Sequence, residues 1–343
     1  MCPELVHDFS IANMCCSDVR RAVLLNLPVD EATTPHILAR MRDVEPLIRK
    51  LVFSAVLEPN TTQGNEPKVM GPTHPRAFTI SQREKIIKDG LGDREESVRN
   101  AATSLIGSWI DCINVATPKI EDPEGEPVVP EVEGVLSLLK LFDLGQGTVA
   151  VDALLSVFTW RLDIFTKIDL NGEECFSVGP FVLSTFLESY WERLNPERAF
   201  LARVFVDHCV AIKDRKRLEE SLPTVSQIAA VIEKAWNGLM VLLEALEEER
   251  LIREFKETEF QQREDEICEQ EIKLGEMLKM AVNLDYGDET GRRLMFPLIR
   301  TYSLAFSLVC ERSMWLRRND FKGDSSSRAF QSVLRHLEEA CCE

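Results

Sequence analysis

The sequence predicts an all-α fold of the HEAT or armadillo type, in which antiparallel helical hairpins stack into an α-solenoid. Two observations lead to this prediction. Apolar residues recur with helical spacing along most of the chain, and a helix–turn–helix pattern occurs more than once in the first third. The chain also has only 16 Gly and 3 Tyr in 343 residues, which argues against an all-β protein with many tight turns.

The stretch from Gly90 to Ile110 contains the clearest copy of this pattern. Asp93 and Glu96 have the spacing of a capping box at a helix start. Apolar residues then follow on one helical face: Val98, Ala101, Ala102, Leu105, Ile106, Trp109, Ile110 and Ile113. Gly90 and Gly92 follow a helix and lie where a C-terminal cap belongs, without the strand or the G-K-[ST] run of a phosphate loop. We interpret these glycines as helix-ending residues.

Two upstream segments share the design of this copy. Asp43 stands where Asp93 does, and in all three copies an arginine follows the first apolar residue of the second helix. The extra spacing before the third copy matches the length of segment 59–79, a loop rich in Pro, Gly, Asn and Thr. Because hairpins stack side by side in a solenoid, a turn Asp can bond to an Arg of its neighbour. We therefore expect a structural Asp/Arg ladder made of Arg20, Asp43, Arg49, Asp93 and Arg99. Contact with a ligand is the alternative role for the three arginines.

Helices continue beyond residue 116, but the repeat becomes weaker. We expect HEAT repeats over 1–116 with a loop insertion at 59–79, and an acidic, Pro-rich linker at 117–130. Further HEAT-like hairpins follow over 131–323, and a short amphipathic tail over 324–343. One long helix is predicted at about 225–284, and its heavily charged middle is typical of a solvated helix.

The formal net charge of −17 argues against nucleic-acid binding by the chain as a whole. The acidic excess lies almost entirely after residue 116, however, so the first third can carry local basic clusters. Basic residues recur there near helix ends, and we expect stacking to align them into a DNA-binding stripe: Arg21, Arg40, Arg42, Lys50, Arg83, Lys85 and Lys88. Ordinary solvated surface is the alternative for each of them. Two later clusters are further candidates: Lys213–Arg217, and Arg317, Arg318 and Lys322.

The sequence predicts neither an enzyme nor a cofactor or metal site. It contains no nucleophile elbow, no H-E-x-x-H and no paired-carboxylate motif, and its 5 His are scattered. Its 10 Cys include no C-x-x-C and no metal-ligand spacing. Apolar runs are shorter than the ~18 residues of a membrane span, and the N-terminus lacks a signal-peptide pattern. We expect an intracellular, soluble protein with reduced thiols.

Four stretches resemble the HEAT-repeat G subunit of condensin, the CAP-G type. They are DVRRAVLLNLPV, ILARMRDVEPLIRKLVFSAVL, ISQREKIIKDGLGDREESVRNAATSLIGSWI and LGEMLKMAVNLDYGDETGRRLMFPLIR, in order between about residues 17 and 300. The resemblance implies a non-catalytic scaffold that binds the kleisin subunit and grips double-stranded DNA without sequence preference. It further implies a role in mitotic chromosome condensation, with ATP hydrolysed by the SMC pair. The expected location is the nucleus and mitotic chromosomes, with a cytoplasmic pool.

The sequence departs from this family in two ways. Family members are far longer, and Met14 stands where the first copy would carry the capping Asp. We therefore expect a fragment or a partial gene model, with an exposed apolar face at its N-terminal end. The rival interpretation is a protein-only HEAT adaptor or transport-type scaffold without DNA binding, which the negative net charge favours. A helical enzyme is a second rival, disfavoured because no catalytic motif is present.

Overall fold

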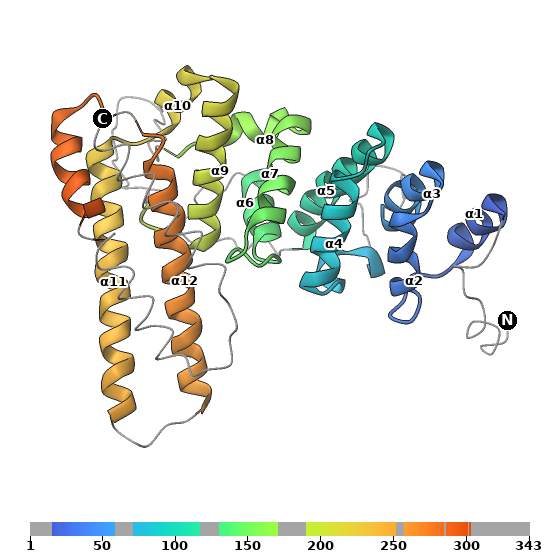
Figure 1. Ribbon diagram of the computed structural model, residues 1–343, viewed down its shortest axis with the longest axis horizontal. Coiled ribbons are helices and arrows are strands. Elements are labelled where there is room, and N and C mark those ends of the chain that lie inside the picture. Colours follow the sequence, from blue (N-terminus) through green and yellow to red (C-terminus); the bar gives the residue numbers. More distant parts are fainter. Residues whose placement is uncertain are drawn as a thin grey trace, which may run out of the picture. The chain divides into compact units, whose positions relative to one another are not determined.

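The computed structural model describes residues 16–58, 71–116, 130–170, 190–251, 257–284, 286–300 and 302. Within these ranges the regular elements are helices, and no strand is present, as Figure 1 shows. The prediction of an all-α, HEAT-like fold is confirmed. The chain divides into two compact units: unit 1 comprises Met1–Asp143 with Gly147–Lys167, and unit 2 comprises Leu144–Gln146 with Ile168–Glu343.

Unit 1 is built from helices that form successive hairpins. Its α-helices are α1 (Ser17–Asn26), α2 (Thr34–Ala39), α3 (Pro46–Leu51), α4 (Ile80–Leu91), α5 (Glu96–Ala116), α6 (Pro130–Leu139), α7 (Thr148–Trp160) and α8 (Leu162–Lys167). A 3₁₀ turn, Arg40–Arg42, follows α2, and a π-helical stretch, Val52–Leu57, follows α3. The second helices contact one another from hairpin to hairpin, since α3 packs on both α1 and α5. Each hairpin therefore buries its apolar face against its neighbours.

The apolar face predicted for α5 forms the centre of the core of unit 1. All eight of its members are buried, and Trp109 packs against Phe78 at 6.2 Å between ring centroids. Gly92 ends α4, as predicted. Gly90 instead lies inside α4, where an added Cβ would be 2.6 Å from Ala102 Cβ and 2.8 Å from the Phe53 ring. Its assignment as a cap is therefore wrong: Gly90 lets α4 approach the neighbouring helices closely.

Several predicted boundaries fall on residues outside the described ranges. Residues 59–70 of the predicted loop, nearly all of the 117–130 linker and the 324–343 tail are among them. The rest of the loop forms 3₁₀ turns at Gly71–Thr73 and Pro75–Ala77, and Thr79 with Gln82 forms a capping box at the start of α4. Helices α6 to α8 belong to unit 1, so this unit extends beyond the repeats recognised in the sequence.

Unit 2 contains α9 (Pro196–Ile212), α10 (Arg215–Ser221), α11 (Val225–Leu251), α12 (Glu257–Ala281) and a helical stretch over 289–300. Helix α12 packs on α9 and on α11, beside which it lies in Figure 1. The single helix predicted at about 225–284 is therefore wrong. Buried Leu239 of α11 and Leu274 of α12 explain the difference, because a continuous helix would leave such side chains exposed. Arg203 of α9 also bonds Glu276 of α12 at 2.7 Å.

None of the described helices has both the length and the apolar character that a membrane crossing requires.

We expect Gly90→Ala to destabilise the protein by about 1–3 kcal/mol, because the new methyl group overpacks the contact with Phe53 and Ala102. The matched control is Gly107→Ala in α5, where the nearest atom is an Arg161 nitrogen 3.9 Å away. This control gains up to about 1 kcal/mol from helix propensity. Urea unfolding of the full chain measures both variants, and equal stability changes would contradict the close-approach role of Gly90.

Candidate functional site

The turn between α2 and α3 holds the first arginine–aspartate contact of the repeat frame. Arg20 of α1 donates from Nε and Nη2 to the two carboxylate oxygens of Asp43, at 3.1 and 3.0 Å. Asp43 is 1% exposed and also accepts a bond from Arg40 at 3.0 Å. Its Oδ1 accepts the backbone N–H of Glu45, the N-cap residue of α3, at 3.0 Å. Asp43 thus joins α1 to the next hairpin and fixes the turn before that hairpin's second helix.

The same arrangement occurs one hairpin later. Arg49 donates from Nε and Nη2 to Asp93 at 2.6 and 2.9 Å, and both side chains are more than nine-tenths buried. Asp93 accepts the Glu95 N–H at 2.8 Å and so fixes the turn directly before α5. Arg49 and Arg99 also donate from Nη1 to the carbonyl oxygens of their own turns, Arg49 to Asp43 and Arg99 to Asp93. Within the described residues, the Arg99 guanidinium bonds only to its own turn, so the predicted ladder contact of Arg99 with an adjacent hairpin is not made there.

These contacts lower the pKa of both aspartates. Hydrogen bonds from Arg49 lower the pKa of Asp93 and outweigh burial, which raises it. Burial raises the pKa of Asp43, but the Glu45 N–H and Arg20 outweigh this effect, so its net pKa is lowered too. The carboxylates are therefore charged at neutral pH, and the ladder consists of ion pairs.

Two of the seven candidate DNA-binding residues have largely buried side chains that bond to other groups of the protein. Arg83 is 5% exposed, and its guanidinium donates to the carbonyl oxygens of Pro75, Phe78 and Leu141. It joins the 71–78 segment and the turn after α6 to α4, so its assignment to a DNA-binding surface is wrong. Arg40 has a side chain only 14% exposed and pairs with Asp43, so we remove it from the exposed set as well.

The other five candidates lie at the surface, but on two different layers of helices. Arg21 and Lys50 are exposed on the second helices α1 and α3, each directly after a ladder arginine. Lys85 and Lys88 are exposed on the first helix α4, and their spacing of three places them on one face. Arg42 is 71% exposed and its guanidinium bonds Asp89 of α4 at 2.8 Å. Arg42, Lys85 and Lys88 form what we call the α4 cluster, and Arg21 and Lys50 the second-helix pair.

Sequence reasoning did not include Arg94 among the candidate cations of this unit. Arg94 lies in the turn before α5, and its side chain is 76% exposed; among the described residues this side chain makes an ion-pair contact with Glu95 at 3.9 Å. Such a surface contact contributes little free energy. The repeat gave no signal for Arg94, because the equivalent position in the preceding copy holds Val44.

The later basic clusters are only partly described. In unit 2, Lys213, Arg215 and Lys216 are exposed, whereas Arg217 is half-buried and donates to the Ile168 carbonyl at 2.6 Å. Arg317, Arg318 and Lys322 lie outside the described residues. Among the residues that the structure describes, no group of three or more His, Cys, Asp or Glu side chains could hold a metal ion.

Breaking the Arg49–Asp93 pair in Asp93→Asn should cost about 3–5 kcal/mol, because the arginine remains buried without a charged partner. Glu96→Gln, which removes an exposed carboxylate from the same helix start, should cost less than about 1 kcal/mol. The double variant Arg49→Met, Asp93→Leu should be less destabilised than Asp93→Asn. Urea unfolding of the full chain tests all three, and a neutral Asp93→Asn would contradict a buried ladder.

The ladder also predicts a dependence of stability on pH. Because the pKa values of Asp43 and Asp93 are lowered below the unfolded value of about 4, their stabilisation is complete above that pH. It is lost as the pH falls from about 4 through the folded-state values. Urea midpoints measured from pH 7 to pH 3 should fall less steeply for Asp93→Asn than for the wild-type chain, and parallel curves would refute the assignment.

Comparisons with known proteins show that this chain is similar to condensin subunits. The chain is 29% identical over 303 residues to condensin complex subunit 3 of Saccharomyces cerevisiae, covering 88% of the chain and 24% of that protein. It is 31% identical over 233 residues to condensin complex subunit 3 of Schizosaccharomyces pombe, covering 67% of the chain and 21% of that protein. The chain thus spans less than a quarter of the length of these relatives. No protein-family model matches it.

A solved structure gives the same indication. The crystal structure of the S. pombe condensin Cnd3–Cnd2 subcomplex is similar to this chain with a TM-score of 0.60 and 26% identity. The similarity covers 96% of this chain and 35% of the solved one. It therefore includes both units.

Proposed function

We propose that the chain is part of a condensin subunit of the G type and acts as a non-catalytic scaffold. In this role it binds the kleisin subunit and double-stranded DNA without sequence preference, for mitotic chromosome condensation. The observation that carries the proposal is the similarity to condensin complex subunit 3 along 88% of the chain. Kleisin binding is further supported by the solved neighbour, which is a complex of two condensin subunits.

The DNA-binding part of the proposal rests on the exposed cations of unit 1. The α4 cluster presents Lys85 and Lys88 on one helix face, and Asp89 holds the Arg42 guanidinium beside them. Cations fixed on a rigid helix can follow a phosphate backbone, and such contacts carry no sequence information. The second-helix pair lies on the other layer of helices, so the two groups are separate candidates.

The assembly and location follow from the same proposal. The SMC ATPase pair is an indirect partner, reached through kleisin, and no cofactor is required by the scaffold itself. The nucleus and mitotic chromosomes are the working locations, with a cytoplasmic pool. One observation favours a second function, a protein-only HEAT adaptor: the net charge of −17, which repels DNA outside local basic clusters.

Binding of the chain to random-sequence duplex DNA, with and without the kleisin subunit, distinguishes the two functions. Affinity should fall steeply with salt, and Lys85→Glu with Lys88→Glu should lower the salt slope by about 2. Arg76→Glu with Lys140→Glu is the matched control, because it reverses two exposed cations of unit 1 outside the α4 cluster. Arg21→Glu with Lys50→Glu tests the second-helix pair in the same way.

The outcomes are distinct. No salt-dependent binding in the presence of kleisin would reject the DNA-binding function and favour the protein-only adaptor. An equal loss of affinity in the control and in the α4 variant would mean that net charge, rather than the α4 cluster, controls binding.

A further inference from the structure

Among the described residues, three arginines make the same contact with the turn before their helix. Arg49, Arg99 and Arg292 each donate from Nη1 to the carbonyl oxygens six and five residues earlier. The distances are 2.9 and 3.4 Å for Arg49, 2.8 and 2.9 Å for Arg99, and 3.2 Å for the contact of Arg292 with Gly287. The turn therefore anchors the guanidinium and leaves its Nε–Nη2 edge free to face outward. We call these residues turn-anchored arginines.

Arg49 shows what this outward edge binds. Its Nε and Nη2 take both oxygens of Asp93, which lies in the turn of the adjacent hairpin, at 2.6 and 2.9 Å. The fork of an arginine matches a carboxylate in this two-point geometry, and an anchored fork loses little conformational entropy on binding.

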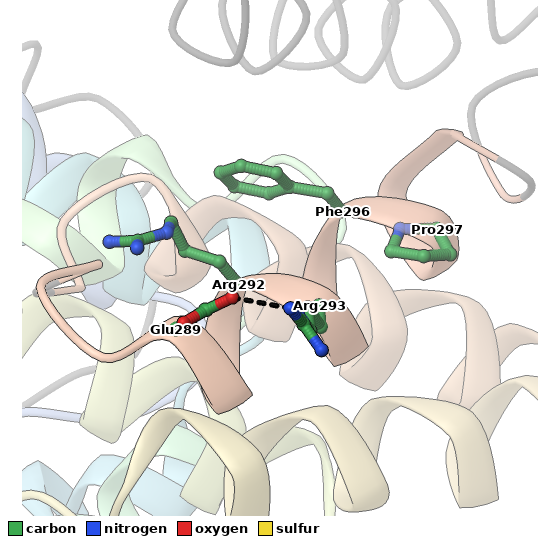
Figure 2. Close-up of a pocket in the computed structure, with 5 residues that line it drawn as sticks. All are labelled: Glu289, Arg292, Arg293, Phe296 and Pro297. Atoms are coloured by element: carbon green, nitrogen blue, oxygen red, sulfur yellow. Dashed lines mark hydrogen bonds and ion pairs between the residues drawn. The ribbon is translucent and has the colours of Figure 1, made fainter.

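The same edge of Arg292 has no partner among the described residues. The bonds of its guanidinium there are those of Nη1 to the turn carbonyls. Arg292 lines an open hollow of about 510 Å³ together with Glu289, Arg293, Phe296 and Pro297. Figure 2 shows these five side chains. Glu289 and Arg293 are bonded to each other at 2.5 Å, so neither competes for the Arg292 fork.

The hollow also has an apolar part beside the fork. Phe296 follows Arg292 by four residues and therefore lies on the same face of the 289–300 helix, as Figure 2 shows. Its ring packs against Tyr286, the residue whose carbonyl anchors Arg292, at 5.4 Å between ring centroids. An oriented cation and a half-buried aromatic ring thus lie side by side on one rigid element.

We propose that this hollow is a docking site for an acidic helical turn of a partner protein. The carboxylate of that turn binds the Nε–Nη2 edge of Arg292, and an apolar side chain next to it packs on Phe296 and Pro297. The Arg49–Asp93 contact is the precedent for the carboxylate. The site goes beyond the proposed function, which places DNA contacts in unit 1.

A carboxylate fits this hollow better than a nucleic acid. Asp288 and Glu289 lie next to the site in sequence, and their charge repels the dense negative charge of a phosphate backbone. A single carboxylate tolerates such neighbours, because Asp93 binds Arg49 although Glu95 and Glu96 follow Asp93 two and three residues later. A nucleic acid at this site is therefore one of the outcomes that the test must exclude.

The test uses the full chain and a capped peptide with the sequence of residues 89–97, DGLGDREES, which carries the carboxylate bound by Arg49. The NMR signals of arginine Nε–Hε groups are followed during titration. We expect the Arg292 signal to shift, and the same peptide with Asp93→Asn to bind at least about tenfold more weakly. Random duplex DNA should not shift it.

Variants of the full chain locate the binding. Arg292→Lys keeps the charge but removes the fork, and should weaken peptide binding by at least about tenfold. Phe296→Ala leaves the anchoring contact in place and should weaken binding as well, which covers the case that Arg292→Lys disturbs the fold. Arg215→Lys, which changes an exposed arginine of unit 2 that does not line the hollow, is the control and should bind the peptide as the wild type does.

Three results would overturn the proposal: no Arg292 shift at millimolar peptide, an equal shift with duplex DNA, or unchanged peptide binding in both Arg292→Lys and Phe296→Ala. Each can be told apart from failure of the DNA-binding function, because that function is measured with DNA and with variants of Lys85 and Lys88 in unit 1.

Discussion

The contact between a turn aspartate and an arginine of the adjacent hairpin sets how one hairpin of unit 1 lies on the next. A buried ion pair contributes little net stability compared with apolar side chains, but a wrong register would leave its charges buried and unpaired. The Arg49–Asp93 pair therefore acts chiefly by making other packing registers of the two hairpins unfavourable. The close approach at Gly90, where α4 has no room for a Cβ, depends on that register.

The same ladder decides which cations remain available for other partners. Arg20, Arg40 and Arg49 lie close in sequence to exposed Arg21, Arg42 and Lys50, yet the aspartates hold the first three inside the repeat frame. Charge counted along the sequence thus overstates the basic surface of unit 1. What the surface keeps is a small number of lysines and arginines, which are fixed in position because the helices that carry them are. A scaffold that binds a phosphate backbone without reading sequence needs only this.

Periodicity predicted the parts of the fold in which one helix face meets another. The repeat predicted the eight buried residues of α5 and four of the five ladder residues, since the structure brings Arg20 to Asp43 and Arg49 to Asp93. The fifth, Arg99, makes no such contact among the described residues. The repeat gave no signal for the burial of Arg83. Its hydrogen-bond partners are backbone carbonyls of an aperiodic segment and of a turn 58 residues away. The break between α11 and α12 could not be predicted from periodicity, for a different reason. Charged residues favour helix in both arrangements, and only the packing of the two apolar faces distinguishes them.

At Arg292 the contact between an arginine and its turn is made without the aspartate of the ladder motif. The ladder pattern requires Asp six residues before the arginine, and Tyr286 stands there instead, so the motif does not include this helix. The contact that Arg292 shares with Arg49 is made to backbone carbonyls, which every residue type supplies. Backbone geometry therefore anchors the arginine, and the aspartate of the motif serves the preceding hairpin instead. An anchored arginine without such an aspartate can still present its Nε–Nη2 edge outward. The group that this edge binds is then set by the surface that packs against the arginine.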